Sequence, residues 1–494
     1  MMMAWRPSAP SRVSPGSSNR RIAGAVRVCL SILLTSVALG VPQETLVVRG
    51  GQRFDTTAGT FRSFGSIVVE GDRIVRVTEP GDTTPLPPGA RELDARGRFV
   101  IPGLIDAHVH LVHILKSLQL TAEDVFPLFL RQGVTTLRDV GDERSEQKRV
   151  ARFAEDHPTL APRVVLGSPL IDGNPPYHPF VSVPLTQVEA VPAWVDAGVD
   201  DGVRTFKLYV GTTREIGQAV IAAAHRRGAW VTAHLAWSYR PLEAIEDGID
   251  SLEHMGALFD FLLPPDAPRW PPPAERRGVP AEELAALQRR ILEAKSRVDF
   301  SGEATTTLIE ALVRRRVRVD PTLVVYRNWM LLRDQPEVLE HADLSSVPER
   351  LLEGWRRSAR ALPLDPTTVA LRQREFLRLQ ELTALLHRSG VELLLGTDTP
   401  VQFCPPGLAL HQEMELWVQA GIPPAAVLQA ATRNNARSLG QADRLGGLEP
   451  GMTADLVVLE ADPLLDIRAA RRIAVVVRSG QVCTPASPEP GRQP

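Results

Sequence analysis

The sequence has few lysines, few cysteines and few aromatic residues. Only four of its 56 basic residues are lysines, three of its 494 residues are cysteines, and 5% are aromatic. The scarcity of cysteine excludes a disulfide-rich scaffold. The formal net charge of −2 leaves no excess of basic residues for a polyanion, so nucleic acid is not an expected partner. Because arginine is the usual cation in this chain, each lysine calls for a specific explanation.

The remaining composition is that of a globular protein with a substantial core. Hydrophobic residues make up 44% of the chain and charged residues 23%, which excludes disorder throughout and a collagen-like structure. At roughly 150 residues per domain, the length corresponds to about three units, or to one large barrel with an appended domain. A single small binding module is excluded.

Residues 1–40 have the pattern of a secretory signal peptide. Several arginines, among them Arg20, Arg21 and Arg27, precede an apolar run over 28–39. A basic segment followed by about 7–15 apolar residues is typical of a signal, whereas a membrane-spanning helix needs about 20. We therefore expect export to a periplasm or to the outside of the cell, with no stable membrane partner after cleavage. The alternative is an uncleaved N-terminal membrane anchor.

Two cysteines lie beyond this segment, Cys404 and Cys483. They fall in different predicted parts of the chain, which favours two separate thiols. A disulfide between them in an oxidising compartment is the alternative.

Short β-branched segments at both ends of the chain predict a small β-sandwich. Residues 43–100 contain runs such as 45–48, separated by glycine and aspartate turns, and a second set, including 454–459, occupies 441–485. Two terminal β-segments around one long middle region favour a single sandwich assembled from both chain ends. A disordered tail is expected at 486–494.

The middle region, 101–440, predicts a (β/α)8 TIM barrel. Apolar runs alternate with helical patterns, the order that is typical of a parallel sheet whose strands are joined by helices. An insertion at about 257–316 follows the sixth strand, and we expect it to form a lid or pocket wall. The eight predicted strands are 100–110, 134–140, 163–171, 205–210, 230–234, 251–254, 317–323 and 392–397.

Histidine and aspartate residues follow several of these strands, at the face where barrel enzymes carry their chemistry. His108 and His110 end the first strand, and their spacing turns both imidazoles to one side, so that both can reach one metal ion. His234, His254 and Asp398 each follow a further apolar strand. Together these residues predict a metal centre inside the barrel.

Lys207 lies within the apolar stretch 205–209. A buried ammonium beside histidine-bound metal ions would be repelled by them and costly to desolvate. If the amine reacts with carbon dioxide, it becomes a carbamate whose two oxygens can bridge two divalent ions. A surface lysine at the end of the strand is the alternative.

These motifs resemble the amidohydrolase superfamily, in particular its binuclear members related to imidazolonepropionases and prolidase-like dipeptidases. The likeness covers most of residues 44–482, and its first and last motifs are the most specific. The motifs are Val100–His110, Phe206–Tyr209, Ser251–His254, Gly396–Asp398 and Gly446–Val458.

The resemblance implies a complete set of ligands for two divalent cations. Zinc is the first choice for mixed imidazole and carboxylate ligands, with manganese or cobalt as alternatives. The implied chemistry is attack by a metal-bridging hydroxide on a carbonyl, with Asp398 passing the proton to the leaving amine. The implied ligands are, for one ion, His108, His110 and Asp398, for the other, His234 and His254, and, as a carboxylated bridge, Lys207.

Further residues are expected near the substrate. His178 follows the third strand and could polarise a carbonyl or bind a carboxylate, and the hydroxyl of Tyr209 could bind a carboxylate. A loop histidine and a packed core tyrosine are the respective alternatives. We expect His113 either to support a metal ligand from behind or to be structural. Arg240 could pair with an acidic substrate, although a solvated side chain is favoured. Aromatic residues after strands five and seven could line an apolar pocket, although packing is their commoner role: Trp237, Tyr239, Tyr326 and Trp329.

We therefore expect an exported metal-dependent hydrolase that cleaves the amide bond of a small molecule, either a dipeptide, including Xaa-Pro dipeptides, or an N-acyl amino acid. A lactonase, a phosphotriesterase and a cyclic-amide hydrolase are alternatives on the same site. A deaminase is disfavoured, because deaminases resembling this family generally use one metal and lack the bridging lysine. A catalytically dead binding protein is the alternative outside enzymes, and the complete ligand set disfavours it. A homo-oligomer is compatible with the sequence.

Overall fold

The computed structural model describes residues 45–483 except 237, 273–274, 335–343, 345–346, 361–364 and 402. The predicted signal peptide at 1–40 and the predicted tail at 486–494 lie outside the described residues. Within the described ranges, no helix combines the length and the apolar character that a membrane crossing requires.

The central sheet of the described residues is a parallel barrel, which confirms the predicted (β/α)8 fold. Residues 392–399 fill its eighth place, because Leu393 bridges Val319 and Thr399 bridges Val109. A short strand, β11 (Ser182–Pro184), pairs with the end of the third barrel strand. The seven regular strands pair in chain order: β8 (Leu104–Val109), β9 (Val134–Asp139), β10 (Arg163–Asp172), β12 (Thr205–Leu208), β13 (Trp230–Ala233), β14 (Ser251–Glu253) and β15 (Arg318–Asp320).

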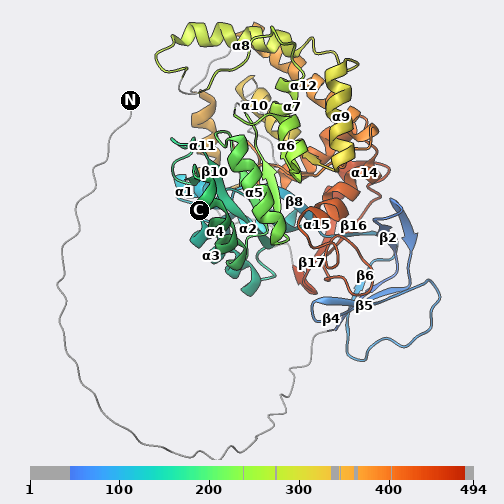
Figure 1. The fold of residues 1–494 in the computed structure, drawn as a ribbon. Helices are drawn as coiled ribbons and strands as arrows, with labels where there is room; N and C mark the ends of the chain where they lie inside the picture. The colour runs from blue at the N-terminus through green and yellow to red at the C-terminus, as the bar shows by residue number, and fades with distance from the viewer. Residues whose placement is uncertain are drawn as a thin grey trace, which may run out of the picture. The chain divides into compact units, whose positions relative to one another are not determined.

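Helices join the strands and cover the barrel from outside (Figure 1). Helix α5 illustrates why they form: the Thr213 side chain caps its N-terminus, and Ile216, Val220 and Ala224 recur every four residues as one buried face. The α-helices are α1 (His113–Ser117), α2 (Ala122–Arg131), α3 (Arg144–Asp156), α4 (Val191–Asp200), α5 (Arg214–Arg226), α6 (Pro241–Asp247), α7 (Gly256–Phe261), α8 (Ala281–Lys295), α9 (Glu303–Arg315), α10 (Leu323–Asp334), α11 (Glu349–Arg360), α12 (Pro366–Arg388), α13 (Leu408–Gln419), α14 (Pro424–Gln429) and α15 (Asn435–Ser438). Shorter helical segments lie at Val188–Ala190, Ala430–Asn434 and Ile467–Arg471.

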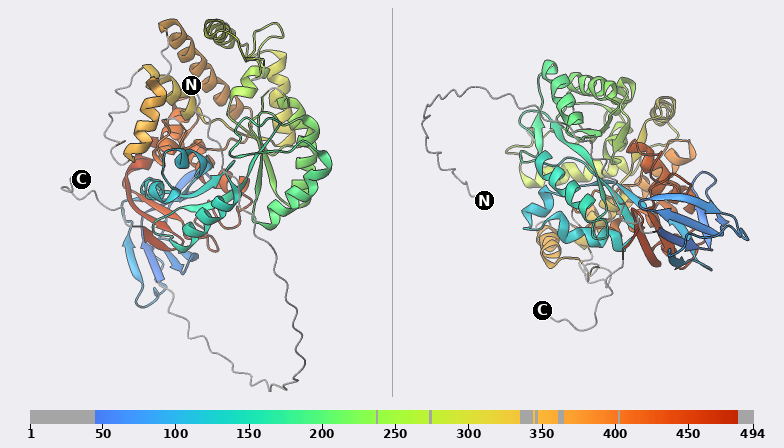
Figure 2. Two further views of the ribbon diagram at one scale, coloured as in Figure 1. Left: turned by 90° about the vertical axis from the view of Figure 1, so that its left-hand side faces the viewer. Right: turned by 90° about the horizontal axis from the view of Figure 1, so that it is seen from below.

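A β-sandwich is built from both ends of the described chain. One sheet has the order β5-β4-β1-β6, and the other has the order β18-β17-β16-β7-β2-β3. Figures 1 and 2 show the early strands, in blue, beside the late strands, in red. Both sheets contribute to one buried apolar cluster, which includes Leu46, Ile67, Val100 and Leu456. The strands are β1 (Thr45–Arg49), β2 (Gln52–Asp55), β3 (Thr60–Ser63), β4 (Ser66–Glu70), β5 (Arg73–Thr78), β6 (Arg91–Asp94), β7 (Phe99–Pro102), β16 (Leu456–Leu459), β17 (Ile473–Arg478) and β18 (Gln481–Cys483).

Three predicted strands differ from the observed ones. Residues 100–110 form two strands, because β7 belongs to the sandwich and β8 to the barrel. Gly103 separates them, and a Cβ there would lie 2.1 Å from the hydroxyl oxygen of Thr135, so no larger residue fits. The predicted seventh strand ends early, at Asp320, because helix α10 begins at Leu323. The predicted eighth strand retains only isolated bridges.

The connection after β14 carries α7, α8 and α9. Lys295 of α8 is largely buried, and its Nζ lies 2.9 Å from Oδ1 of Asp260 in α7 and 3.1 Å from Oε1 of Glu375 in α12. A buried ammonium requires such partners, because isolating it from water is costly. Lys295 thereby ties three helices into one wall.

Cys404 and Cys483 are both buried free thiols, as the sequence favoured. Burial raises the pKa of the Cys404 thiol well above its usual value and that of Cys483 to about 11. Both thiols are therefore protonated at neutral pH.

The ion pair between Arg163 and Asp455 connects the barrel strand β10 to the sandwich. Arg163 Nη1 lies 2.6 Å from Asp455 Oδ2, and both side chains are mostly buried. Arg163→Met leaves this carboxylate without its cation. We expect the free energy of unfolding to fall by about 3 kcal/mol and the melting temperature to fall by roughly 3 °C.

The control is Arg49→Met, which removes the exposed partner of Glu92. Exposed pairs contribute at most about 1 kcal/mol, so differential scanning calorimetry should show a shift of about 1 °C or less. Equal shifts for the two variants would refute the role assigned to the buried pair.

Candidate metal centre

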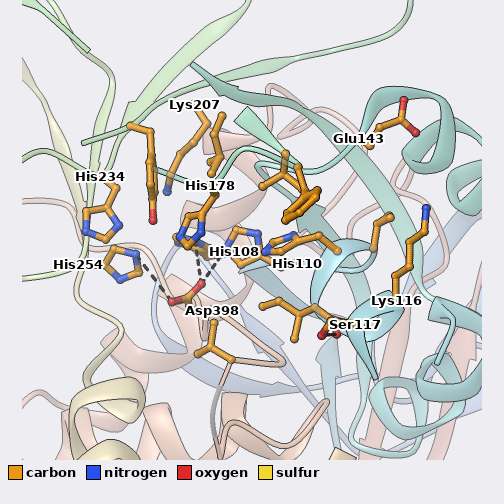
Figure 3. A pocket seen from close by; sticks show the side chains of 18 residues that line it. His108, His110, Lys116, Ser117, Glu143, His178, Lys207, His234, His254 and Asp398 are labelled. Carbon is orange, nitrogen blue, oxygen red and sulfur yellow. Dashed lines mark hydrogen bonds and ion pairs between the residues drawn. The ribbon is translucent and has the colours of Figure 1, made fainter. Parts of the chain in front are cut away.

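Imidazole and carboxylate groups from separate strands meet in one cavity of the barrel (Figure 3). Asp398 Oδ1 lies 2.9 Å from His110 Nε2 and 3.4 Å from His108 Nε2. The other carboxylate oxygen, Oδ2, lies 3.9 Å from His254 Nε2. Ligand atoms of His108, His254 and Asp398 all lie within 4.8 Å of one another, which suits a shared metal ion.

Lys207 and His234 line the same cavity. The ring centroids of His234 and His254 are 4.5 Å apart. Lys207 Nζ and His108 Nε2 are buried, and neither has a hydrogen-bond partner among the described residues. Because buried polar atoms are rarely left without partners, these atoms fit a site that cations complete. The structure thus brings all six predicted ligands together, and their division between two ions stays a prediction.

Burial keeps the histidines of this site neutral. Burial, together with the charge of the nearby Lys207, lowers the pKa of His108 to about 4 and that of His234 to about 3. Neutral imidazole is the form that binds metal ions. Burial also lowers the pKa of the Lys207 amine, which increases the fraction of free amine able to react with carbon dioxide.

A buried network orients His108 from behind. His108 Nδ1 lies 2.8 Å from Glu253 Oε2, and Arg138 Nη2 donates to Glu253 Oε1 at 2.7 Å. The hydroxyl of Thr232 also donates to Oε1, at 2.5 Å. With its Nδ1–H held by a carboxylate, the imidazole of His108 presents Nε2 to the cavity. The sequence analysis assigns no role to Glu253 or Arg138. The only signal that could have identified them is that each is a charged residue inside an otherwise apolar strand.

The backbone is strained at two of the predicted ligands. His254 and Asp398 have φ values of 63° and 59°, a conformation that costs a non-glycine residue about 1–3 kcal/mol. Hydrogen bonds hold it in place: the His254 N–H donates to Asp320 O at 2.8 Å, and the Asp398 N–H donates to His108 O at 2.7 Å. At the neighbouring Gly396, a Cβ would lie 2.7 Å from that of His108. Strain of this kind is typical of functional sites.

His178 and Tyr209 also line the cavity, whose volume is about 670 Å³. Their ring centroids are 5.6 Å apart. Burial lowers the pKa of His178 and raises that of Tyr209, so the imidazole is neutral and the phenol is protonated at neutral pH. Both rings can therefore donate a hydrogen bond to a polar group in the cavity. The rest of the lining includes the apolar side chains Val112, Ile114, Leu170, Phe180, Val181 and Val401.

His113 borders the cavity without joining the six ligands. Its Nδ1 lies 2.5 Å from Asp142 Oδ1, and Asp142 also accepts the backbone N–H of His113 at 2.9 Å. This pairing agrees with the structural role predicted for His113. With His110, these two residues form a second group of metal-type ligands.

The aromatic residues predicted after strands five and seven do not line the metal-centre cavity where they are described. Tyr239 is buried, and its hydroxyl donates to Asp247 at 2.9 Å. Tyr326 borders a separate cavity. Trp237 and the side chain of Trp329 lie outside the described residues.

The site therefore lies at the strand ends of a parallel barrel, where barrel enzymes carry their catalytic groups, and it gathers histidine, lysine and aspartate side chains, which are metal-type ligands. Residues 99–265 match one model of the amidohydrolase family, and residues 278–483 match another. The chain therefore belongs to the amidohydrolase family.

Several known proteins are similar to this chain. Imidazolonepropionase from Cupriavidus necator is 23% identical over 436 residues, which cover 84% of this chain and 90% of that protein. Adenine deaminase from Sinorhizobium fredii is 35% identical over 98 residues, which cover 20% of this chain but only 15% of the deaminase. Among solved structures, a candidate prolidase from Bifidobacterium longum is 25% identical, with a TM-score of 0.63 over 91% of this chain and 96% of that one.

Glu253→Gln tests the network behind His108. The amide keeps the shape of the side chain but removes the charge that Arg138 pairs with and that holds the His108 ring. We expect the affinity for divalent metal to fall about 10–100-fold, measured by competition with a chromophoric chelator.

Glu375→Gln is the matched control, because Glu375 is a mostly buried carboxylate that pairs with Lys295 and does not line the metal-centre cavity. Its metal affinity should equal that of the wild type. An unchanged affinity in Glu253→Gln would show that Glu253 does not orient the ligand.

Proposed function

We propose that this amidohydrolase cleaves the amide bond of a dipeptide or an N-acyl amino acid, using two divalent cations. One observation carries the proposal: the amine of Lys207, which has no hydrogen-bond partner among the described residues, shares a cavity with Asp398 and with the four histidines predicted as ligands. Family membership supports hydrolysis of a carbon–nitrogen bond in general. The similarity to a candidate prolidase supports a peptide-like substrate.

The ligands would divide between the two cations as the sequence predicts. The amine of Lys207 would add to carbon dioxide and release one proton, which forms a carbamate with two oxygens for the two cations. Zinc is the first choice, and manganese or cobalt could occupy the same ligands. The two sets would be His108, His110 and Asp398 for one cation, and His234 and His254 for the other, with Lys207 between them.

The bound cations would supply Lewis acidity that activates a water molecule and polarises the substrate carbonyl. Asp398, within 4 Å of three of the imidazoles, is placed to take a proton from the attacking water and pass it to the leaving amine. His178 and Tyr209 would bind the substrate carbonyl or carboxylate.

Other reactions use a similar arrangement of groups. A lactonase, a phosphotriesterase or a cyclic-amide hydrolase would need the same activated water, and a panel of amides, lactones, cyclic imides and phosphotriesters separates them. We expect turnover of amides, and turnover of esters or phosphotriesters alone would overturn the choice of bond. The predicted N-terminal signal adds the proposal that the reaction takes place outside the cytoplasm.

Metal content tests the proposed site directly. Protein produced with bicarbonate should carry about two divalent ions per chain, since two cations complete such a site. Lys207→Ala should carry fewer, because its bridge is lost. Lys148→Ala, at an exposed lysine on α3, is the matched control and should keep the wild-type content. A wild-type protein without metal after incubation with zinc or manganese would contradict the proposal.

Asp398→Asn tests the proton transfer. Removing a positioned acid–base group typically costs 10²–10⁴-fold, so we expect kcat to fall by about 10³. Elemental analysis of the same sample shows whether the variant still binds metal. It therefore distinguishes the loss of a proton carrier from the loss of a metal ligand. A variant that retains metal and keeps kcat within about threefold of wild type would exclude Asp398 as the proton carrier.

A further inference from the structure

A second cavity adjoins the metal centre. Its volume is about 740 Å³, and it shares His234 and Tyr209 with the metal-centre cavity. The connection after β14 forms one of its walls, through α7 and the segment around Trp270. The predicted insertion is thus a pocket wall, but it borders this second cavity, and none of its described residues lines the first.

Aromatic rings and prolines line part of the second cavity, beside the charged side chains of Asp260, Glu275, Arg240 and Arg269. Tyr177, Phe261 and Trp270 face it, together with three prolines. The guanidinium of Arg240 lies 5.8 Å from the ring centroid of Phe261 and makes no ion pair with a described residue. Aromatic faces and a guanidinium without a carboxylate partner form a surface on which an aromatic ring can stack.

The wall of this cavity is fixed in place. Asp260 of α7 is held by Lys295, as described above. Arg269 donates to the carbonyl oxygens of Leu263, Pro264 and Pro265, which closes the chain on itself just before Trp270. The cavity is therefore bounded by a tied segment rather than by a free loop.

The position of Asp398 decides which half of an amide enters which cavity. Asp398 lines the first cavity and not the second, and it must reach the nitrogen of the leaving amine. With Asp398 as the proton carrier, the amine half would occupy the first cavity, among Val112, Ile114 and Val181. The acyl half would then extend past Tyr209 and His234 into the second cavity.

We propose that the substrate is an N-acyl amino acid with a bulky aromatic acyl group, which fills the second cavity, and an apolar amino acid, which fills the first. This inference rests on the proposed function and specifies its substrate class. Each cavity alone has the volume of a site for a drug-sized ligand, about 300–1,000 Å³, whereas an acetyl or glycyl group would leave the second cavity filled with water.

A series of amides with one amine and increasing acyl size tests the proposal. The metal-loaded full chain is assayed with N-acetyl-, N-benzoyl- and N-(2-naphthoyl)-L-leucine. We expect kcat/KM to rise at least tenfold from the acetyl to the naphthoyl compound. Ala257→Phe, which places a ring in the second cavity, should lower the naphthoyl-to-acetyl ratio of kcat/KM at least tenfold.

Ala285→Phe is the matched control, because Ala285 is exposed on α8 and lines neither cavity. Its ratio should equal that of the wild type. Trp270→Ala is a second test variant, which removes an aromatic ring from the second cavity without introducing a steric clash. It should also lower the naphthoyl-to-acetyl ratio of kcat/KM. Circular dichroism and metal content show that each variant is folded and loaded.

The outcomes separate the inference from the function on which it rests. Equal or faster hydrolysis of N-acetyl-L-leucine would overturn the aromatic acyl group and leave amide hydrolysis standing. An unchanged ratio in both Ala257→Phe and Trp270→Ala would place the acyl group elsewhere. If protein that carries two cations hydrolyses none of the three amides but does hydrolyse a dipeptide, the N-acyl substrate is overturned and amide hydrolysis stands. If it hydrolyses neither these amides nor dipeptides, both proposals are overturned.

Discussion

Burial of the Lys207 amine among metal-type ligands is the constraint on which the rest of the site depends. The amine has no hydrogen-bond partner among the described residues, and its charge lowers the pKa values of His108 and His234. An isolated ammonium in such a place costs several kcal/mol, so the chain must neutralise it, modify it or surround it with ligands. The proposed conversion to a carbamate would turn the same side chain from a cation that repels metal ions into an anion that binds them.

The barrel supplies the rigidity that this chemistry needs. Strand ends position His108 and His110, while His254 and Asp398 adopt strained backbone conformations that neighbouring hydrogen bonds maintain. Behind them, Glu253 fixes the ring of His108. The predicted ligands are thus held in place by their covalent neighbours and by a buried network, which is the preorganisation that efficient catalysis requires.

The sequence indicates which residues gather in the metal-centre cavity, but not the buried network or the second cavity beside them. A strand places alternate residues on one face, so the positions of His108 and His110 follow from local spacing. Arg138 and Glu253 are 115 residues apart and meet only because the barrel closes, so no local pattern predicts their pairing. The break between β7 and β8 at Gly103 depends on close contact with Thr135, which lies on the neighbouring strand β9. The second cavity combines side chains from several connections, and its existence could not be predicted from any one of them.

Anomalous X-ray scattering from crystals grown with zinc and bicarbonate tests the proposed two-cation site. We expect two peaks at the zinc edge, about 3.5–4 Å apart as in known two-metal sites, with electron density for two oxygens and a carbon extending from Lys207 Nζ. A single peak between His110, His113 and Asp142, the other ligand group that includes His110, together with an unmodified Lys207, would contradict it.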